Sequence, residues 1–297
     1  MGNASSFTIN QLRDYSTLFS RNQVKSWLKQ DFTSIYKKMN RYDEDWFENN
    51  NSSFLEYLRY IYKILENNYQ NEYVFKNSFL NEILINDIIS GDSKVFSEFR
   101  IGNAVADLVL FNGTSKVFEI KTEMDSAKRL DIQLKNYRTA FNEIYLIIPE
   151  SKSKEYTYLE QEIGIITYQP NDLEKFKITR KATSNETVDP NVIMEVFHTN
   201  EYKGLVLEYF GSLPRMTSFN QFEKCKELIL QIPNHILNSY FISIMKRRQK
   251  QVAIAKKHYK EFNQISLALK LTTTERKELI GLLKSPIKQT PYVLSTA

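Results

Sequence analysis

Three short segments separated by turns constrain the fold of this chain more than any other part of it. Apolar and polar residues alternate from Lys94 to Ile101 and from Ala104 to Phe111, and a third run extends from Ser115 to Thr122. Alternation of this kind is typical of β-strands, in which successive side chains point to opposite faces. Gly102-Asn103 and Asn112-Gly113 separate the runs, and Asn-Gly is a strong hairpin signal. The sequence therefore predicts an antiparallel meander of three strands.

The segments on either side of this meander predict a mixed α/β core. Apolar residues at three- and four-residue spacing indicate helices, and short, wholly apolar runs are typical of strands buried in parallel pairing. The expected helices cover residues 72–89, 127–141 and 152–162, and the further expected strands cover residues 143–148 and 163–168. The predicted order is helix, three-strand antiparallel meander, helix, strand, helix, strand.

Three regions are expected along the chain. Residues 1–71 have amphipathic helical periodicity, residues 72–180 form the α/β core, and residues 181–297 are again helical and basic. The polar, Pro-containing stretch at 181–191 marks the second boundary. Helices are expected in the last region at residues 219–231, 236–258 and 272–284, the third with Thr272 and Glu275 spaced as a capping box.

Composition excludes several classes of protein. The chain is 42% apolar and 25% charged, as in ordinary globular domains, so disordered and fibrous classes are not expected. No apolar run is long enough to span a membrane. The N-terminus has no secretory signal pattern. Cys225 is the only cysteine, which excludes an intramolecular disulfide and a Cys-based zinc site and fits a cytoplasmic location.

Positive charge is concentrated towards the end of the sequence. Residues 240–297 contain twelve Lys and Arg against three Glu, a net charge of +9 in a chain whose total is +5. A basic segment of this kind indicates either a polyanionic partner or a solvated helical face.

The predicted meander contains a set of residues suited to metal chemistry. Asp107 lies in a strand that is otherwise apolar, where a carboxylate without a partner would be costly, and a cation would be a suitable partner. In the next strand, Glu119 and Lys121 are two residues apart and therefore share one face. Gln133 and Tyr137 follow, one helical turn apart.

Asp107, Glu119 and Lys121 on adjacent strands resemble the signature of the PD-(D/E)xK nuclease superfamily. The resemblance covers residues 72–170 and includes the order of the elements and the Gln133-x-x-x-Tyr137 spacing of the RecB-like branch. Ala106 stands where the signature has Pro. The resemblance implies a restriction-endonuclease-like core, here with helical N- and C-terminal additions, and a metal-dependent nuclease.

The resemblance also implies a role for each residue. Asp107, Glu119 and the carbonyl of Ile120 would hold Mg²⁺ or Mn²⁺, which prefer oxygen ligands. Lys121 would orient water and stabilise developing charge. Glu82 on the preceding helix would complete the metal shell, with Glu72 and Glu98 as alternatives.

Several further residues are expected to contact nucleic acid. The resemblance places Gln133 and Tyr137 beside the site and the bound strand. Arg129 and Arg100 are candidates for phosphate contacts near the site, and a basic run offers further contacts: Lys246, Arg247 and Arg248.

These observations predict a metal-dependent nuclease that hydrolyses phosphodiester bonds, with DNA as the expected substrate and bacterial or phage defence or toxicity as the expected role. Two alternatives remain open: a catalytically idle nucleic-acid-binding or regulatory protein, and an RNA-cleaving toxin. A Glu-x-Lys pair can also be no more than a solvated charge pair on a strand. A homodimer and a protein partner bound by the helical flanks are open as well.

Overall fold

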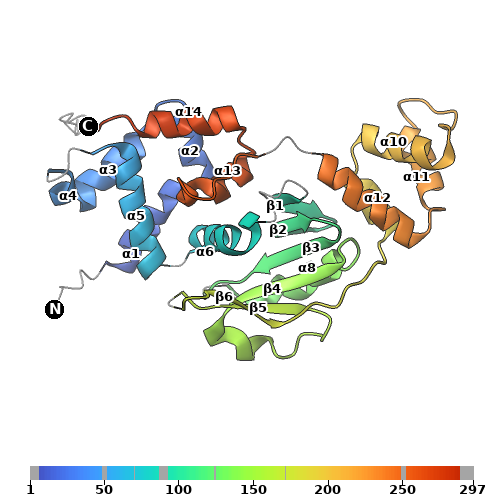
Figure 1. The fold of residues 1–297 in the computed structure, drawn as a ribbon, viewed down its shortest axis with the longest axis horizontal. Coiled ribbons are helices and arrows are strands. Elements are labelled where there is room, and N and C mark those ends of the chain that lie inside the picture. Colours follow the sequence, from blue (N-terminus) through green and yellow to red (C-terminus); the bar gives the residue numbers. More distant parts are fainter. Residues whose placement is uncertain are drawn as a thin grey trace. The chain divides into compact units, whose positions relative to one another are not determined.

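A computed structural model describes residues 7–48, 52–69, 71–86, 93–123, 125–170, 172–248 and 252–287. The chain divides into two compact units, coloured along the sequence in Figure 1. Residues 78–251 form the sheet unit, and residues 1–77 together with 252–297 form the helical unit. This division differs from the three consecutive regions expected from the sequence, because residues from both ends of the chain share one hydrophobic core.

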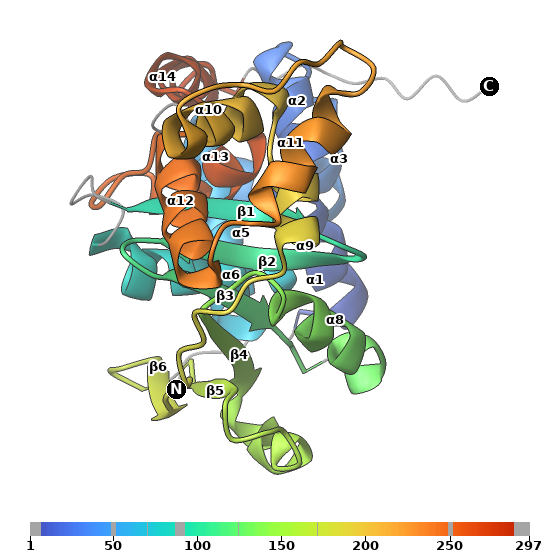
Figure 2. The ribbon, with the colours of Figure 1, turned by 90° about the vertical axis from the view of Figure 1, so that its right-hand side faces the viewer.

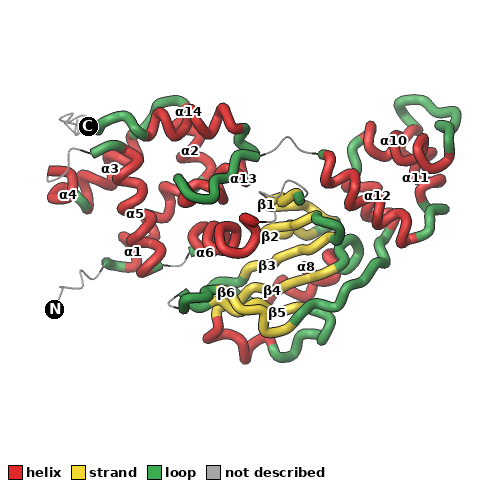
Figure 3. The backbone as a smooth tube through the Cα atoms, viewed as in Figure 1, coloured by secondary structure: helices red, strands yellow, loops and turns green. Residues whose placement is uncertain are grey.

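The sheet unit is built on one mixed sheet in the order β1-β2-β3-β4-β5-β6, whose strands are the yellow parts of the tube in Figure 3. Parallel pairing joins β3 to β4 and β4 to β5, and the other neighbours are antiparallel. The strands are β1 Lys94–Ile101, β2 Ala104–Phe111, β3 Ser115–Ile120, β4 Glu143–Pro149, β5 Gly164–Tyr168 and β6 Phe176–Arg180.

The predicted meander is confirmed. The strands β1, β2 and β3 begin where they were expected, and Phe111 pairs with Ser115 across the Asn112-Gly113 hairpin. Gly113 has φ +121°, a conformation that favours glycine. The sequence did not predict β6, a strand of five residues of which only Phe176 is buried.

The helices of the sheet unit follow the predicted positions with changes at their ends. The expected helix 72–89 is α6 continued by a π-helical turn, and residues 87–92 lie outside the described part. The expected helix 152–162 is a short 3₁₀ segment. The bounds are α6 Glu72–Phe79 (which spans the division between the units), η2 Leu80–Leu84, η3 Ala127–Arg129, α8 Leu130–Tyr137, η4 Glu150–Tyr156, α9 Pro190–Val196, α10 Thr199–Phe210, α11 Gln221–Ile229 and α12 Asn234–Arg247.

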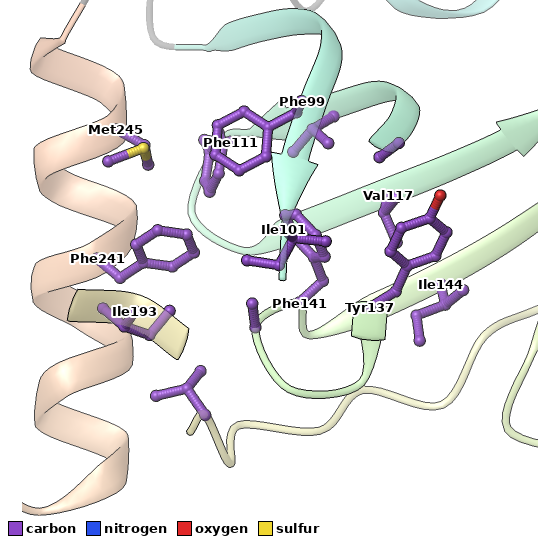
Figure 4. Close-up of a cluster of buried hydrophobic side chains, with 14 of the residues drawn as sticks. Phe99, Ile101, Phe111, Val117, Tyr137, Phe141, Ile144, Ile193, Phe241 and Met245 are labelled. Carbon is purple, nitrogen blue, oxygen red and sulfur yellow. The ribbon is translucent and has the colours of Figure 1, made fainter. Parts of the chain in front are cut away.

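Helices cover the two faces of the sheet differently. On one face α8, α9 and α12 contact the first two strands, as Figure 2 shows. Their apolar side chains share a core with the strands, and Figure 4 shows Phe241 and Met245 of α12 directed towards Phe111. On the other face Phe79 packs against Phe118 and Phe176. Val117 and Phe118 therefore point to opposite faces, as the alternation in β3 requires.

The helical unit buries a second core of aromatic and aliphatic side chains. The capping box expected at Thr272 and Glu275 is confirmed. The expected helix 236–258 was too long: α12 ends at Arg247, and residues 252–258 are not helical. The bounds are α1 Ile9–Ser16, η1 Thr17–Phe19, α2 Arg21–Leu28, α3 Thr33–Tyr42, α4 Glu44–Glu48, α5 Phe54–Asn68, η5 Lys260–Phe262, α13 Asn263–Leu269 and α14 Thr273–Leu283. Among the described residues, no helix combines the length and apolarity needed to cross a membrane.

Candidate active site

The structure places Asp107 on β2 and Glu119 on β3, the two strands of the Asn-Gly hairpin. The last pair of this hairpin before the two acids is Leu108 with Phe118, so Asp107 and Glu119 are the next residues on each strand. The backbone N–H of Ile120 donates a hydrogen bond of 2.8 Å to Oδ2 of Asp107. The carboxylate of Asp107 is thus fixed beside Ile120, the residue that follows Glu119.

Glu119 is the centre of a buried hydrogen-bond network. Its side chain is only 3% exposed, and both carboxylate oxygens accept hydrogen bonds. Lys121 Nζ donates to Oε1 at 2.8 Å, and Gln133 Nε2 donates to the same oxygen at 2.6 Å. Tyr137 Oη lies 2.6 Å from Oε2 and 3.1 Å from the carbonyl oxygen of Val105. We call Asp107, Glu119, Lys121, Gln133 and Tyr137 the Glu119 cluster.

The helix α8 supplies the polar side of this cluster. Gln133 and Tyr137 are four residues apart and so lie on one helical face. Gln133 contacts both charged residues, because its Oε1 also accepts a hydrogen bond of 2.9 Å from Lys121 Nζ. The five residues that the sequence singled out as catalytic therefore come together in the fold.

Burial sets the electrostatics of the cluster. Burial raises the pKa of Glu119 above its ordinary value, and the nearby charge of Asp107 raises it further, while Lys121 and the hydrogen bonds oppose this shift. Burial and the charge of Glu119 also raise the pKa of the Tyr137 hydroxyl, so this group stays protonated and acts as a donor. Two neighbouring carboxylates in a buried place favour a bound cation.

The strands are irregular where they meet the cluster. Glu98 of β1 lies opposite Asp107, between the pairs Ser97–Leu108 and Phe99–Ala106, and has φ +53°. The side-chain alternation shifts by one residue here. Phe96 and Phe99 of β1 are three residues apart but lie in the same core, and so do Ala106 and Val109 of β2. Such irregularities re-aim side chains and are frequent at functional sites.

The donor set of the cluster suits a hard cation. Magnesium takes oxygen ligands from one or two carboxylates and keeps several waters. Asp107 and Glu119 supply such oxygens, and Ile120 between Glu119 and Lys121 has a backbone carbonyl. No group of three or more His, Cys, Asp or Glu residues suited to a metal occurs in the described ranges. Asp107 and Glu119 are the two carboxylates that the cluster offers to a cation.

The structure does not bring Glu82 into this group. Glu82 lies on η2, the helical turn that begins directly after Phe79. The ring of Phe79 packs against Phe118 on the other face of the sheet. Its carboxylate pairs with Lys175 Nζ at 3.2 Å. Of the alternatives, Glu72 pairs with Lys76, and Glu98 is the acid that lies opposite Asp107.

The basic candidates occupy different surroundings. Arg129 and Arg100 are exposed on the sheet unit, at the N-terminal side of α8 and at the end of β1. Arg247 is exposed, and Lys246 is half-buried. Arg248 instead forms an ion pair with Glu201 and donates to the carbonyl of Val196 at 2.8 Å. Arg248 therefore ties α12 to α10 and the end of α9.

Sequence reasoning missed one residue that positions the cluster. Asn136 Oδ1 accepts a hydrogen bond of 3.1 Å from the backbone N–H of Asn103, which links α8 to the β1–β2 turn. Gly102 in this turn has φ +51°, and a Cβ atom there would lie 2.4 Å from Asn136 Oδ1. The Gly102-Asn103 turn was recognisable from the sequence, but its partner on α8 was not.

Tyr137→Phe is expected to lower the free energy of unfolding of the sheet unit by about 1–2 kcal/mol, because buried Glu119 loses one of its donors. Urea unfolding, followed by hydrogen exchange of β3 and α8, measures this change. Tyr158→Phe is the matched control, since Tyr158 is an exposed tyrosine of the same unit. Equal stability of the two variants would show that the Tyr137 hydroxyl contributes nothing to holding Glu119.

The fold and the cluster define a mixed α/β protein with a buried acid–lysine site between a hairpin and a helix. Comparison by sequence identifies its family. Residues 65–273 match the family of bacteriophage P4 protein cII, and the chain belongs to this family.

One curated protein and one solved structure are similar to parts of this chain. Protein cII of Enterobacteria phage P4 is 30% identical over 122 residues, which are 40% of this chain and 46% of that protein. The match thus spans less than half of the relative's length. A solved structure of a protein of unknown function from Silicibacter pomeroyi covers 44% of this chain and 89% of its own, with 16% identity and a TM-score of 0.29. A likeness this low supports no conclusion.

Proposed function

We propose that this chain is a metal-dependent nuclease that hydrolyses phosphodiester bonds, with DNA as the expected substrate, on a restriction-endonuclease-like core. The observation that supports the proposal is the convergence of Asp107, Glu119 and Lys121 with Gln133 and Tyr137 of α8. The sequence led us to expect that all five residues take part in phosphodiester hydrolysis.

Each residue has a role that its contacts support. Asp107, Glu119 and the carbonyl of Ile120 would hold Mg²⁺ or Mn²⁺, which lowers the pKa of a bound water and screens the phosphate. Lys121, buried beside Glu119, stabilises negative charge that develops on the phosphate and positions the attacking water. Gln133 and Tyr137 fix the orientation of the Glu119 carboxylate. They are positioning residues in this proposal.

The test is cleavage of plasmid, single-stranded DNA and tRNA with Mg²⁺, with Mn²⁺ and with chelator. The wild-type chain is expected to cleave at least one substrate only when metal is present, and Asp107→Asn to reduce the rate at least about hundredfold. Asparagine keeps an acceptor for the Ile120 N–H but lacks the charge that a cation needs. Asp131→Asn, an exposed acid on α8, is the matched control.

The three substrates also separate the candidate functions. Cleavage of tRNA alone would favour an RNA-cleaving toxin over the DNA nuclease. Equal rates for the wild-type chain and Asp107→Asn on every substrate would refute the enzymatic proposal.

Nucleic-acid binding without cleavage is a second candidate. The observation in its favour is that Lys121 is already bonded to both Glu119 and Gln133, so these polar groups are satisfied within the protein. Affinity for DNA that is equal with metal and with chelator, without any cleavage, would favour this function.

A further inference from the structure

A polar cavity lies in the sheet unit, away from the Glu119 cluster. Its volume is about 380 Å³, within the range of small-molecule sites. The hairpin turn at Gly113 and Thr114 forms one wall. Glu119 is five residues beyond Thr114, roughly 16 Å along an extended strand, so the cavity and the cluster are separate.

One face of α12 forms the opposite wall, and we call this space the α12 cavity. The lining residues recur at three- and four-residue spacing, so they share one side of the helix. The opposite side of α12 is in the core, as Phe241 and Met245 in Figure 4 show. The α12 residues that line the cavity include His235, Asn238, Ser239, Ser243, Lys246 and Arg247.

The charges of the lining favour an anion. Lys246 and Arg247 lie on the cavity, while Glu186 is its one acidic residue among the described lining residues. Hydroxyl groups of Thr114 and Ser184 add neutral hydrogen-bond donors. Two cations with several hydroxyl donors are suited to a phosphate, whose oxygens accept many hydrogen bonds.

A buried amide indicates that the ligand also has a donor. Asn238 lines the cavity and is only 6% exposed, and its Oδ1 accepts no hydrogen bond from the described residues. Buried side-chain oxygens normally have a partner. A shift of the Asn238 side chain would bring this buried oxygen to the cavity surface, where a sugar hydroxyl or a base amino group would supply the missing donor.

The size of the cavity restricts the ligand further. A continuous single strand needs an extended groove that follows its backbone. A cavity of about 380 Å³ instead accommodates one nucleotide-sized group. We propose that the α12 cavity binds a phosphomonoester attached to a nucleoside, the group found in a free nucleotide or at the 5′ end of a nucleic-acid strand. This inference goes beyond the proposed nuclease function and does not depend on it.

The test is calorimetric binding to the full chain in the presence of chelator, so that cleavage plays no part. The probes are inorganic phosphate, adenosine monophosphate, and one short oligonucleotide with either a 5′-phosphate or a 5′-hydroxyl. The wild-type chain is expected to bind a probe that has both a phosphomonoester and a nucleoside. Binding of the mononucleotide identifies a free nucleotide as the ligand, and binding of the phosphorylated oligonucleotide alone identifies a strand end.

Substitutions assign the binding to this cavity. Arg247→Gln and Lys246→Gln are each expected to weaken binding about tenfold, because each removes a charge-assisted contact. Arg215→Gln removes the same charge from an exposed position outside the cavity and is expected to leave the affinity unchanged. Urea unfolding of each variant confirms that the fold is intact.

Three results would overturn the inference. They are the absence of binding to every phosphomonoester probe, affinity that both cavity substitutions leave unchanged, and equal affinity for the 5′-phosphate and 5′-hydroxyl oligonucleotides when adenosine monophosphate does not bind. In each case the cavity is not a phosphomonoester site, whether or not the chain is a nuclease.

Discussion

Lys121→Met is expected to reduce the proposed metal-dependent nuclease activity about a thousandfold, the largest loss expected from one substitution if the chain has this activity. The ammonium group of Lys121 is held in place by Glu119 and Gln133, and the side chain is only 7% exposed. A fixed charge in a place with little water stabilises a developing negative charge far more than a solvated lysine does. Methionine has similar volume and no charge, so the chemistry is removed with little change in packing.

The measurement is the single-turnover cleavage rate on the substrate that the wild-type chain cleaves best. Loss of Lys121 also leaves Glu119 buried without its cation, which is expected to lower the stability by about 3 kcal/mol. The double variant Glu119→Gln, Lys121→Met avoids this charge imbalance and should regain stability while remaining inactive. The combination of restored folding and lost cleavage therefore separates a catalytic effect from an unfolded site.

Lys135→Met is the matched control, because Lys135 is an exposed lysine on α8 of the same unit. Weaker substrate binding by the variant would also reduce the cleavage rate, so the affinity for the substrate is measured in parallel in the presence of chelator. Folded Lys121→Met is expected to keep the salt dependence of nucleic-acid binding that the wild-type chain has, since a buried lysine makes few phosphate contacts. Cleavage by folded Lys121→Met at the wild-type rate would remove Lys121 from the mechanism.

The convergence of the Glu119 cluster was predictable because each step depended on local chemistry. The Asn112-Gly113 hairpin sets β2 beside β3, and the period of two places Lys121 on the side of Glu119. The period of the following helix then brings Gln133 and Tyr137 to one face. Each rule relates residues that are close in the sequence, so the arrangement of the cluster can be predicted from the sequence.

Features that depend on distant contacts were not predictable in this way. The ion pair of Glu82 with Lys175 joins residues far apart in sequence, and nothing local to Glu82 indicates it. The positive φ of Glu98 has no signal either, because Glu is not a residue that favours this conformation. The short strand β6 is fixed by pairing with β5 rather than by its own pattern.

The composition of the helical unit is another result of distant contacts. Residues 181–297 were expected to be a helical region, and periodicity alone does not show that α12 and α13 belong to different cores. The division becomes clear only from burial: Phe241 packs with the sheet, whereas Phe262 packs with helices from the start of the chain.

Arg276→Met is expected to lower the free energy of unfolding of the helical unit by about 3 kcal/mol or more, the largest stability effect we expect. Arg276 begins the second turn of α14 but is only 6% exposed. Its guanidinium donates hydrogen bonds to the following acceptors: the carbonyl oxygen of Ala253 at 2.6 Å, Asn263 Oδ1 at 2.7 Å, Ser266 Oγ at 3.2 Å and the carbonyl oxygen of Tyr259 at 2.8 Å.

These acceptors belong to the irregular segment between Ala253 and Asn263 and to α13. A segment without its own ladder of backbone hydrogen bonds depends on side chains to satisfy its carbonyl groups. Burial lowers the pKa of Arg276 from its ordinary value, but an arginine side chain stays charged at neutral pH. Methionine would fill part of the volume and leave several buried acceptors without a donor.

Hydrogen exchange of residues 252–287, together with urea unfolding, measures the effect on the helical unit, and exchange of β2 and β3 reports on the sheet unit in the same experiment. Lys277→Met is the control, because Lys277 is the exposed neighbour of Arg276 on α14. Faster exchange should be confined to the helical unit, since the acceptors of Arg276 all lie in it. If Arg276→Met and Lys277→Met exchange at the same rates, the buried guanidinium does not hold this segment, and the apolar contacts of Phe262 and Leu279 alone must do so.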